Sequence, residues 1–169
     1  MHLQLYQDRH FSALAVAMTE LDQHYFGSKA APLPEVENSL RAGMLSAESG
    51  VTVLLALDAD EVAGLATFSL LYPAPEQRAQ LFMKDLFVRQ AWRSAGVGHA
   101  LMKYLANYAV QKNCVRFDWT TEITNTGAMS FYERLGAAPV AEKIYYRLTG
   151  NALLELARSE TSPRTAGDA

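Results

Sequence analysis

The sequence has little cysteine and no long hydrophobic run, and each shortage excludes a class of protein. Its one cysteine, Cys114, cannot form a disulfide within the chain, which fits a reducing compartment and predicts a cytoplasmic location. The longest nearly uncharged apolar runs, residues 51–57 and 62–71, are far too short to cross a bilayer, so we expect no membrane span. A charged segment followed by an apolar core is missing from the first residues, so no signal peptide is predicted.

The sequence also lacks an excess of basic charge. Acidic and basic residues are mixed along the chain, and the net charge is −3. A nucleic-acid partner would require a basic patch or arm. We therefore expect no nucleic acid as a partner.

What the sequence does contain is enough apolar mass for one ordinary domain. It has 169 residues, half of them hydrophobic, and shows no internal repeat, low-complexity stretch or linker. We expect a single domain over residues 1–158. Residues 159–169 are polar, and a disordered tail is predicted there.

The hydrophobic periodicity predicts helices first, then a strand meander, then alternating strands and helices. An acidic turn at residues 58–61 favours a hairpin between two of the strands, and Gly136 suits a helix C-cap. The expected strands are residues 2–5, 51–57, 62–71, 79–88, 115–121 and 143–148. The expected helices are residues 9–25, 34–45, 96–113, 126–135 and 151–158.

This order predicts an α/β fold with a mixed central sheet. Helices that alternate with the later strands indicate a partly parallel sheet covered by helical layers. The helix at residues 96–113 should join two parallel strands by a right-handed crossover. We expect about six to seven strands flanked by about four to five helices.

The loop from Arg93 to Gly98 has the composition of an anion site. It lies between a strand and a helix, where backbone N–H groups and the helix N-terminus attract negative charge. Its two glycines, Gly96 and Gly98, let the backbone approach phosphate oxygens. Two glycines in such a turn are equally typical of tight packing. Leu101 stands where a dinucleotide fingerprint needs glycine, and the lysine of a Walker loop is absent.

Two motifs together resemble the acetyl-CoA-binding half of the GNAT superfamily. The Arg-x-x-Gly-x-Gly loop at residues 93–98 follows a strand that ends in Asp-Leu-Phe-Val. Residues 125–137 read Asn-Thr-Gly-Ala-Met-Ser-Phe-Tyr-Glu-Arg-Leu-Gly-Ala, similar to the family's second hallmark, Asn…Ala…Phe-Tyr-x-x-x-Gly-Ala. The order and spacing of the motifs match. The sequence looks most similar to the diamine-acetyltransferase-like branch, and the resemblance covers roughly residues 51–158.

The resemblance implies a fold, a co-substrate and a set of binding residues. In this family two parallel strands splay apart, and the pantetheine arm of acetyl-CoA lies between them; here these are residues 81–88 and 115–121. The implied cofactor-binding residues come from the first strand, the loop and the second motif. They are Leu86, Phe87, Val88, Arg93, Ser94, Ala95, Gly96, Val97, Gly98, His99, Asn125, Tyr132 and Arg134.

The resemblance gives Tyr132 a catalytic role as the acid that protonates the departing thiolate. The chemistry is reasonable, because a phenol with a pKa near 10 can hydrogen-bond and protonate a thiolate whose acid has a pKa of about 8.5. The alternative is that Tyr132 only packs beneath the loop. An amine would attack the thioester directly, so Cys114 is interpreted as a core residue rather than a nucleophile.

Lys84 departs from the pattern of the branch. Diamine acetyltransferases resembling this chain carry a glutamate there, which acts as a base through water and attracts a polyamine. A lysine would repel a polycation, so it either faces solvent or pairs with the carboxylate of an amino-acid-like acceptor. The general base is left unassigned, with Asp85, Asp118 and Glu122 as acids that have equally plausible structural roles.

The acceptor is expected to be a primary amine of a small molecule. Candidate substrate residues share a place near the first inter-helix loop or the expected acceptor pocket, where aromatic walls can stack or hydrogen-bond. They are His24, Tyr25, Tyr72, Lys84 and Tyr145, with Tyr146 beside them. His24 has an alternative reading as a surface histidine. The histidines lack metal-ligand spacing, so no metal is expected.

Two other functions remain open at this point. One is a non-catalytic acyl-CoA-binding sensor on the same fold, suggested by the missing acidic base. The other is a protein or peptide N-acetyltransferase, which would need an open groove where residues 143–158 are expected to close the fold. The resemblance also implies a homodimer formed through terminal strands, for which the apolar residues 144–148 are suited.

Overall fold

The computed structural model describes residues 1–159, so all of the expected tail except Ser159 lies outside the described residues. The described chain divides into two compact units, Met1–Glu122 and a second that begins at Ile123. The expectation of a single domain over residues 1–158 stays a prediction.

The first unit contains a five-stranded mixed sheet in the order β1-β2-β3-β4-β5. Its first three junctions are antiparallel, and β4 and β5 run parallel. The strands are β1 (His2–Leu5), β2 (Thr52–Asp58), β3 (Glu61–Leu71), β4 (Ala79–Val88) and β5 (Cys114–Trp119). The expected mixed sheet with a parallel pair is confirmed, but within residues 1–159 it has five strands rather than six to seven.

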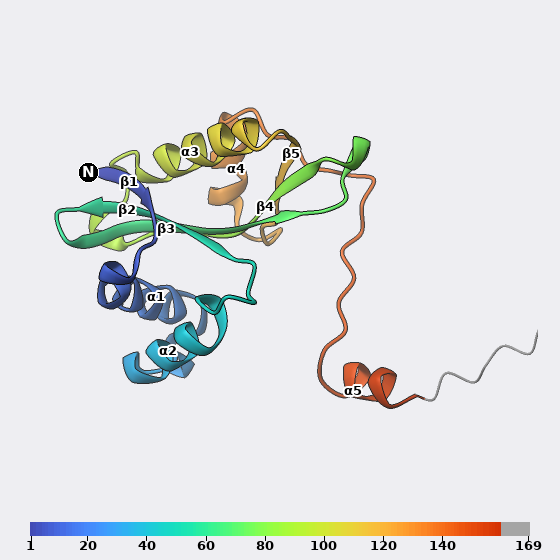
Figure 1. Ribbon diagram of the computed structural model, residues 1–169, viewed down its shortest axis with the longest axis horizontal. Coiled ribbons are helices and arrows are strands. Elements are labelled where there is room, and N and C mark those ends of the chain that lie inside the picture. The colour runs from blue at the N-terminus through green and yellow to red at the C-terminus, as the bar shows by residue number, and fades with distance from the viewer. Residues whose placement is uncertain (160–169) are drawn as a thin grey trace, which may run out of the picture. The chain divides into compact units, whose positions relative to one another are not determined.

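Helices cover both faces of this sheet (Figure 1). On one face lie α1 (Phe11–Phe26) and α2 (Leu33–Ser39), which a π-helical turn at Leu40–Met44 extends. On the other face lies α3 (Val97–Gln111), which connects the parallel strands β4 and β5. Together with α4 (Thr126–Arg134) and α5 (Gly150–Arg158) of the second unit, the described residues form five α-helices, within the expected four to five.

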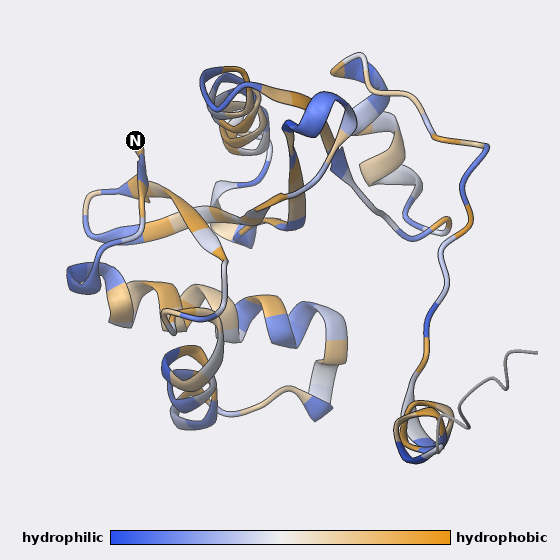
Figure 2. Ribbon diagram, turned by 45° about the vertical axis from the view of Figure 1, so that its right-hand side comes forward, coloured by the Kyte–Doolittle hydropathy of each residue, from blue (hydrophilic) through white to orange (hydrophobic). Residues whose placement is uncertain are grey.

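Each face of the sheet contributes alternate side chains to its own core, as strand geometry requires. Leu65 of β3 and Phe87 of β4 are paired across the strands and pack with buried residues of α1. On the opposite face, the ring of Phe68 contacts that of Tyr108 on α3 at 5.1 Å between centroids. The strands are accordingly hydrophobic over much of their length (Figure 2).

Gly64 on β3 is required by close packing. A Cβ at this position would lie 2.8 Å from the Phe87 carbonyl oxygen and 3.0 Å from Cγ1 of Val97. The glycine therefore lets α3 approach the sheet at the level where β4 ends.

The second unit contains α4 (Thr126–Arg134) and α5 (Gly150–Arg158). Asn125 caps α4, its side-chain oxygen accepting from the Ala128 N–H at 3.1 Å. Gly136 follows the last turn with φ of +87°, so the expected glycine C-cap is confirmed.

No helix in the described part of the chain is long and apolar enough to cross a membrane.

The expected strand at residues 143–148 is wrong. The segment has no strand hydrogen bonds, and its large side chains are exposed, Ile144 by 76% and Tyr146 by 85%. An apolar, tyrosine-rich segment forms a strand only when a second strand pairs with its backbone groups. No described strand pairs with this segment.

Candidate functional site

The parallel strands β4 and β5 stop pairing halfway along β4. Their register runs from Ala79 opposite Cys114 to Met83 opposite Trp119. β4 then continues through residues 84–88, paired only with β3. No strand in the described chain covers the other edge of residues 84–88, so backbone hydrogen-bonding groups are available there. This is the divergence that the resemblance implied for these two strands.

The loop after β4 presents a group of unpaired backbone donors. No backbone N–H from Ser94 to His99 donates a hydrogen bond of ordinary geometry within the described residues. Ser94 and Gly96 both have left-handed backbones, with φ of +64° and +80°. Such a conformation turns successive N–H groups toward one concave surface, at the start of a fifteen-residue helix. This arrangement suits an anion.

The two ends of this loop are held differently. Arg93, which is exposed, donates from Nε to the Val88 carbonyl at 3.1 Å, so its guanidinium lies at the end of β4. Val97 is only 1% exposed. Its side chain belongs to the core, and it can offer a ligand only its backbone.

Sequence reasoning missed an anchor that joins α1 to the end of β4. Arg89 donates from Nε to Glu20 at 2.7 Å, and the Gln90 N–H donates to the other oxygen of Glu20 at 3.0 Å. Burial would raise the pKa of Glu20, but the hydrogen bonds from Arg89 and Gln90 and the charges of Arg89 and Arg93 outweigh it and lower the pKa. Since 69 positions separate Glu20 from Arg89, no local pattern could have revealed this pair.

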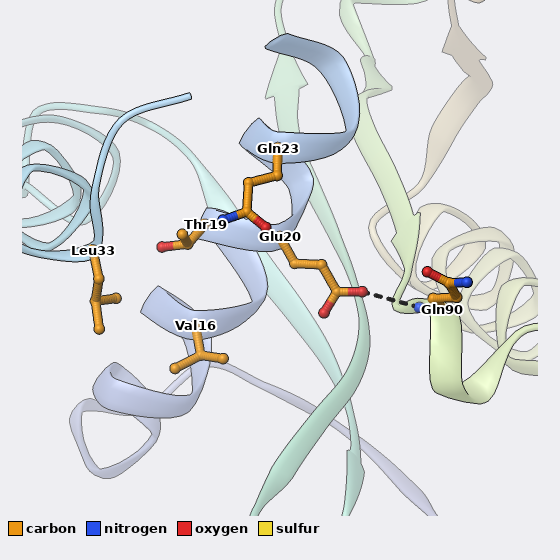
Figure 3. Close-up of a pocket in the computed structure, with 6 residues that line it drawn as sticks. All are labelled: Val16, Thr19, Glu20, Gln23, Leu33 and Gln90. Atoms are coloured by element: carbon orange, nitrogen blue, oxygen red, sulfur yellow. Dashed lines mark hydrogen bonds between the residues drawn. The ribbon is translucent and has the colours of Figure 1, made fainter. Parts of the chain in front are cut away.

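The same anchor borders a cavity of about 440 Å³ beside α1 (Figure 3). Its lining consists of Val16, Thr19, Glu20, Gln23, Leu33 and Gln90. None of the residues expected to bind co-substrate or acceptor is among them. The cavity is therefore not the site that the sequence predicted.

Two expected acceptor residues lie at the end of α1, beside residues 84–88, which we call the free half of β4. The ring centroid of His24 is 6.1 Å from that of Phe87 and 5.4 Å from that of Tyr25. Burial and then the negative charges of Asp85 and Glu122 raise the pKa of the Tyr25 phenol. The structure thus brings His24 and Tyr25 together with β4.

Lys84 and Asp85 lie at a β-bulge. Thr67 of β3 pairs with Asp85, and the next β3 residue, Phe68, pairs with Met83, so Lys84 is the extra residue. The Lys84 side chain is exposed, whereas Asp85 is half-buried and accepts a 2.6 Å hydrogen bond from the Thr67 hydroxyl.

Tyr72 is not part of this group. It follows Leu71, which pairs with Gln80, four positions before Lys84. Because a strand rises about 3.3 Å per residue, four positions correspond to about 13 Å along the strand. The register therefore does not bring Tyr72 together with Lys84.

The remaining expected residues belong to the second unit. Asn125 is the α4 cap, and the Phe131 and Tyr132 rings pack edge to face at 5.3 Å between centroids. Arg134, in the last turn of α4, is exposed. Tyr145 is 71% exposed, and the Arg147 guanidinium lies 5.4 Å from its ring centroid.

No group of three or more His, Cys, Asp or Glu side chains in the described part of the chain is arranged to hold a metal ion. The expectation that the protein uses no metal stays a prediction.

Comparisons with known proteins agree with this geometry. The chain is 35% identical over 92 residues to an L-ornithine N5-acetyltransferase of Arabidopsis thaliana, covering 54% of this chain and 40% of that protein. It is 28% identical over 99 residues to a thialysine N-epsilon-acetyltransferase of Mus musculus, covering 57% and 58%. The chain thus spans about half the length of these curated relatives.

Solved structures extend the likeness over nearly the whole chain. An integron cassette protein from the mobile metagenome of V. cholerae superposes with a TM-score of 0.90 at 42% identity, covering 94% of this chain and 98% of that one. The model of the acetyltransferase (GNAT) family matches residues 15–137. That match includes the divergent strands β4 and β5, the loop of unpaired N–H donors at residues 94–99 (the donor-rich loop) and the second motif. The chain therefore belongs to the acetyltransferase (GNAT) family.

Proposed function

We propose that this protein transfers the acetyl group of acetyl-CoA to a primary amine of a small molecule by direct attack. The observation that carries the proposal is the free half of β4. Residues 84–88 offer backbone groups on an edge that no described strand covers, directly before a loop of unpaired N–H donors. An extended amide-containing chain that ends in a pyrophosphate needs these two features in this order.

The residues present fit acetyl-CoA as a substrate. In the proposal, the backbones of Leu86, Phe87 and Val88 bind the pantetheine arm. The loop N–H groups and Arg93 bind the pyrophosphate oxygens. Asn125 and Arg134 are also proposed to contact acetyl-CoA, and the only support for these two is their place in the second motif.

The chemistry needs no protein nucleophile. Cys114 is half-buried at the start of β5, and burial raises the pKa of its thiol, which keeps it protonated at neutral pH. An alkylammonium with a pKa near 10.4 costs about 4–5 kcal/mol to deprotonate at pH 7, so a group that handles the proton is useful. A backbone N–H on the free edge of β4 would polarise the thioester carbonyl. The role of Tyr132 as the acid for the thiolate is proposed from the motif.

The acceptor that we propose is amino-acid-like. His24 and Tyr25 lie beside the free half of β4, and exposed Lys84 could pair with a carboxylate at the same bulge. Two relatives carry names that specify ornithine and thialysine, amino acids with a second amine. A diamine has no carboxylate for Lys84. Tyr72 and Tyr145 have no such support from the geometry of β4.

A homodimer and a cytoplasmic location belong to the same proposal. The segment 143–148 exposes Ile144, Tyr145 and Tyr146, and α5 exposes Leu153, Leu154 and Leu156. Such a run of exposed apolar residues is unusual for a monomer and suits a second copy of the chain. Light scattering after size exclusion should give twice the monomer mass, and Tyr146→Glu should shift it toward the monomer. A wild-type monomer at all concentrations would contradict the dimer.

The first test is calorimetric titration of acetyl-CoA into wild type and Gly98→Trp. The matched control is Gly43→Trp, because Gly43 is exposed with open space around its Cα. We expect wild type and the control to bind and Gly98→Trp to lose binding, all three with intact folds by circular dichroism. Wild type that does not bind acetyl-CoA would overturn the proposal.

Thiol release with a panel of amines then separates an enzyme from an acyl-CoA-binding sensor. The panel is L-ornithine, thialysine, L-lysine, putrescine and cadaverine. We expect turnover with the amino acids to exceed turnover with the diamines and Lys84→Glu to reverse that preference. Binding without turnover on any amine favours the sensor. An unchanged preference in Lys84→Glu would remove the amino-acid-like acceptor but not the transferase.

A further inference from the structure

One polar side chain is buried in the core of the first unit. Thr67, in the middle of β3, is 2% exposed, and its neighbours Ala66 and Phe68 are buried as well. A valine would fill the same space without a hydroxyl to desolvate. The hydroxyl is satisfied because Oγ1 donates to Oδ2 of Asp85 at 2.6 Å. Thr67 thus fixes one carboxylate oxygen of Asp85 from inside the core.

The bulge determines where this carboxylate points. Asp85 pairs with Thr67, two positions from Leu65 and Phe87, so alternation places it on the sheet face that packs against α1. Met83 pairs with Phe68 on the opposite face. The extra residue, Lys84, lets two consecutive side chains turn to the α1 face. Lys84 and Asp85 are then neighbours on one side of β4.

The second carboxylate oxygen of Asp85 is available. Oδ1 has no hydrogen-bond partner in the described part of the chain, and the residue is half-buried rather than enclosed. The charge of Asp85 acts on the phenol of Tyr25 at the end of α1. Asp85 also begins the free half of β4. A fixed carboxylate with one open oxygen therefore lies where an acceptor would approach an acyl group bound along that edge.

The other acids near this edge are less suitable. Asp118 of β5 forms an ion pair with Arg116 at 3.0 Å. Glu122 is exposed, so its carboxylate is not held by the core. Only Asp85 combines an open oxygen with a buried donor that holds the group in place.

We propose that Asp85 takes the proton from the attacking amine, and that Thr67 is the positioning residue that holds its carboxylate. This inference rests on the proposed acetyl transfer. The acceptor first loses one proton to solvent and binds as a free amine, with an N–H donated to Oδ1. As nitrogen attacks the thioester carbon and gains positive charge, its second proton moves to Asp85. The C–S bond breaks, and the thiolate takes a proton from its acid, which is then reprotonated from solvent. Asp85 returns its proton to solvent.

The test compares the acceptor kinetics of wild type, Asp85→Asn, Thr67→Val and Thr67→Ser at saturating acetyl-CoA. The acceptor is whichever of L-ornithine, thialysine and cadaverine wild type turns over fastest. The matched control is Glu37→Gln, which neutralises a half-buried acid on α2. Calorimetry with acetyl-CoA and thermal unfolding are measured for every variant.

We expect Asp85→Asn to lower kcat by about 100-fold or more, the usual contribution of an acid–base group. Thr67→Val should lower kcat by about 5- to 10-fold with little change in KM, as expected when a reacting group is slightly misplaced. Thr67→Ser, which keeps the hydroxyl, should return to within about twofold of wild type. We also expect a difference in how kcat depends on pH. A fall of kcat in acid that wild type shows because a carboxylate becomes protonated should be absent from Asp85→Asn.

Two results would overturn the inference while leaving the proposed function intact. The first is a kcat for Asp85→Asn within threefold of the wild-type value. The second is an equal kcat for Thr67→Val and Thr67→Ser. Wild type that binds acetyl-CoA but turns over no amine would instead overturn the proposed function, and the role of Asp85 with it.

Discussion

The two halves of β4 have different neighbours. Residues 79–83 pair with β3 on one edge and with β5 on the other, and Leu81 at their centre is completely buried. Residues 84–88 pair with β3 alone, and their side chains range from exposed Lys84 to buried Phe87. One half is therefore a core element and the other is a surface edge held in place by it. The difference suggests that stability and binding can be altered separately along one strand.

The largest expected effect tests the paired half. Leu81→Ala removes a fully buried side chain from the centre of the sheet and should lower the free energy of unfolding by about 2–5 kcal/mol. Leu86→Ala is the matched change in the free half, where the side chain is half-buried, and should cost less than about 1.5 kcal/mol. Urea unfolding followed by circular dichroism measures both. Equal losses would mean that the two halves do not differ as described.

The next effect tests how the free half is held. Gly64→Ala would place a Cβ 2.8 Å from the Phe87 carbonyl oxygen and 3.0 Å from Val97. Relief requires β3, β4 or α3 to shift, so we expect a loss of about 1–3 kcal/mol. The shift should also weaken acetyl-CoA binding, because α3 begins at the donor-rich loop. Gly43→Ala, in open space, is the control, and a Gly64→Ala protein as stable as wild type would show that the packing there is loose.

A smaller effect tests the anchor at the end of the free half. Glu20→Gln removes the charge that accepts from Arg89 and Gln90, and should cost about 1–2 kcal/mol. Because the folded state lowers the pKa of Glu20, its contribution is present above the unfolded pKa of about 4.3 and is lost as pH falls through the folded value. Wild type should therefore lose its stability advantage over Glu20→Gln in acid. An advantage that is constant from pH 7 to pH 3 would contradict this assignment.

The sequence predicted the elements of the first unit well because each has its own pattern. Two apolar runs joined by the acidic turn at residues 58–61 marked the hairpin of β2 and β3, and helical spacing marked α1 and α3. Motif glycines and Arg93 identified the loop, whose open donors the structure then revealed.

The rest depended on contacts between distant parts of the chain. The bulge at Lys84, the Thr67–Asp85 bond and the Glu20–Arg89 pair arise only when strands and helices are brought together. The wrong strand at residues 143–148 has the same origin, because an apolar composition cannot reveal whether a strand is available to pair with the segment.

The smallest expected effect on stability tests the loop beside the free half of β4. Arg93 is exposed, and within the described residues its side chain makes one hydrogen bond, to the Val88 carbonyl at 3.1 Å. Arg93→Gln should therefore change the free energy of unfolding by less than about 0.5 kcal/mol. Its charge should nevertheless matter for a pyrophosphate, and acetyl-CoA binding should weaken by about 5- to 10-fold at low salt. Raising the ionic strength should shrink the difference between wild type and Arg93→Gln, since salt screens an exposed charge. Binding that is equal in both proteins at low salt would show that the backbone donors alone hold the anion.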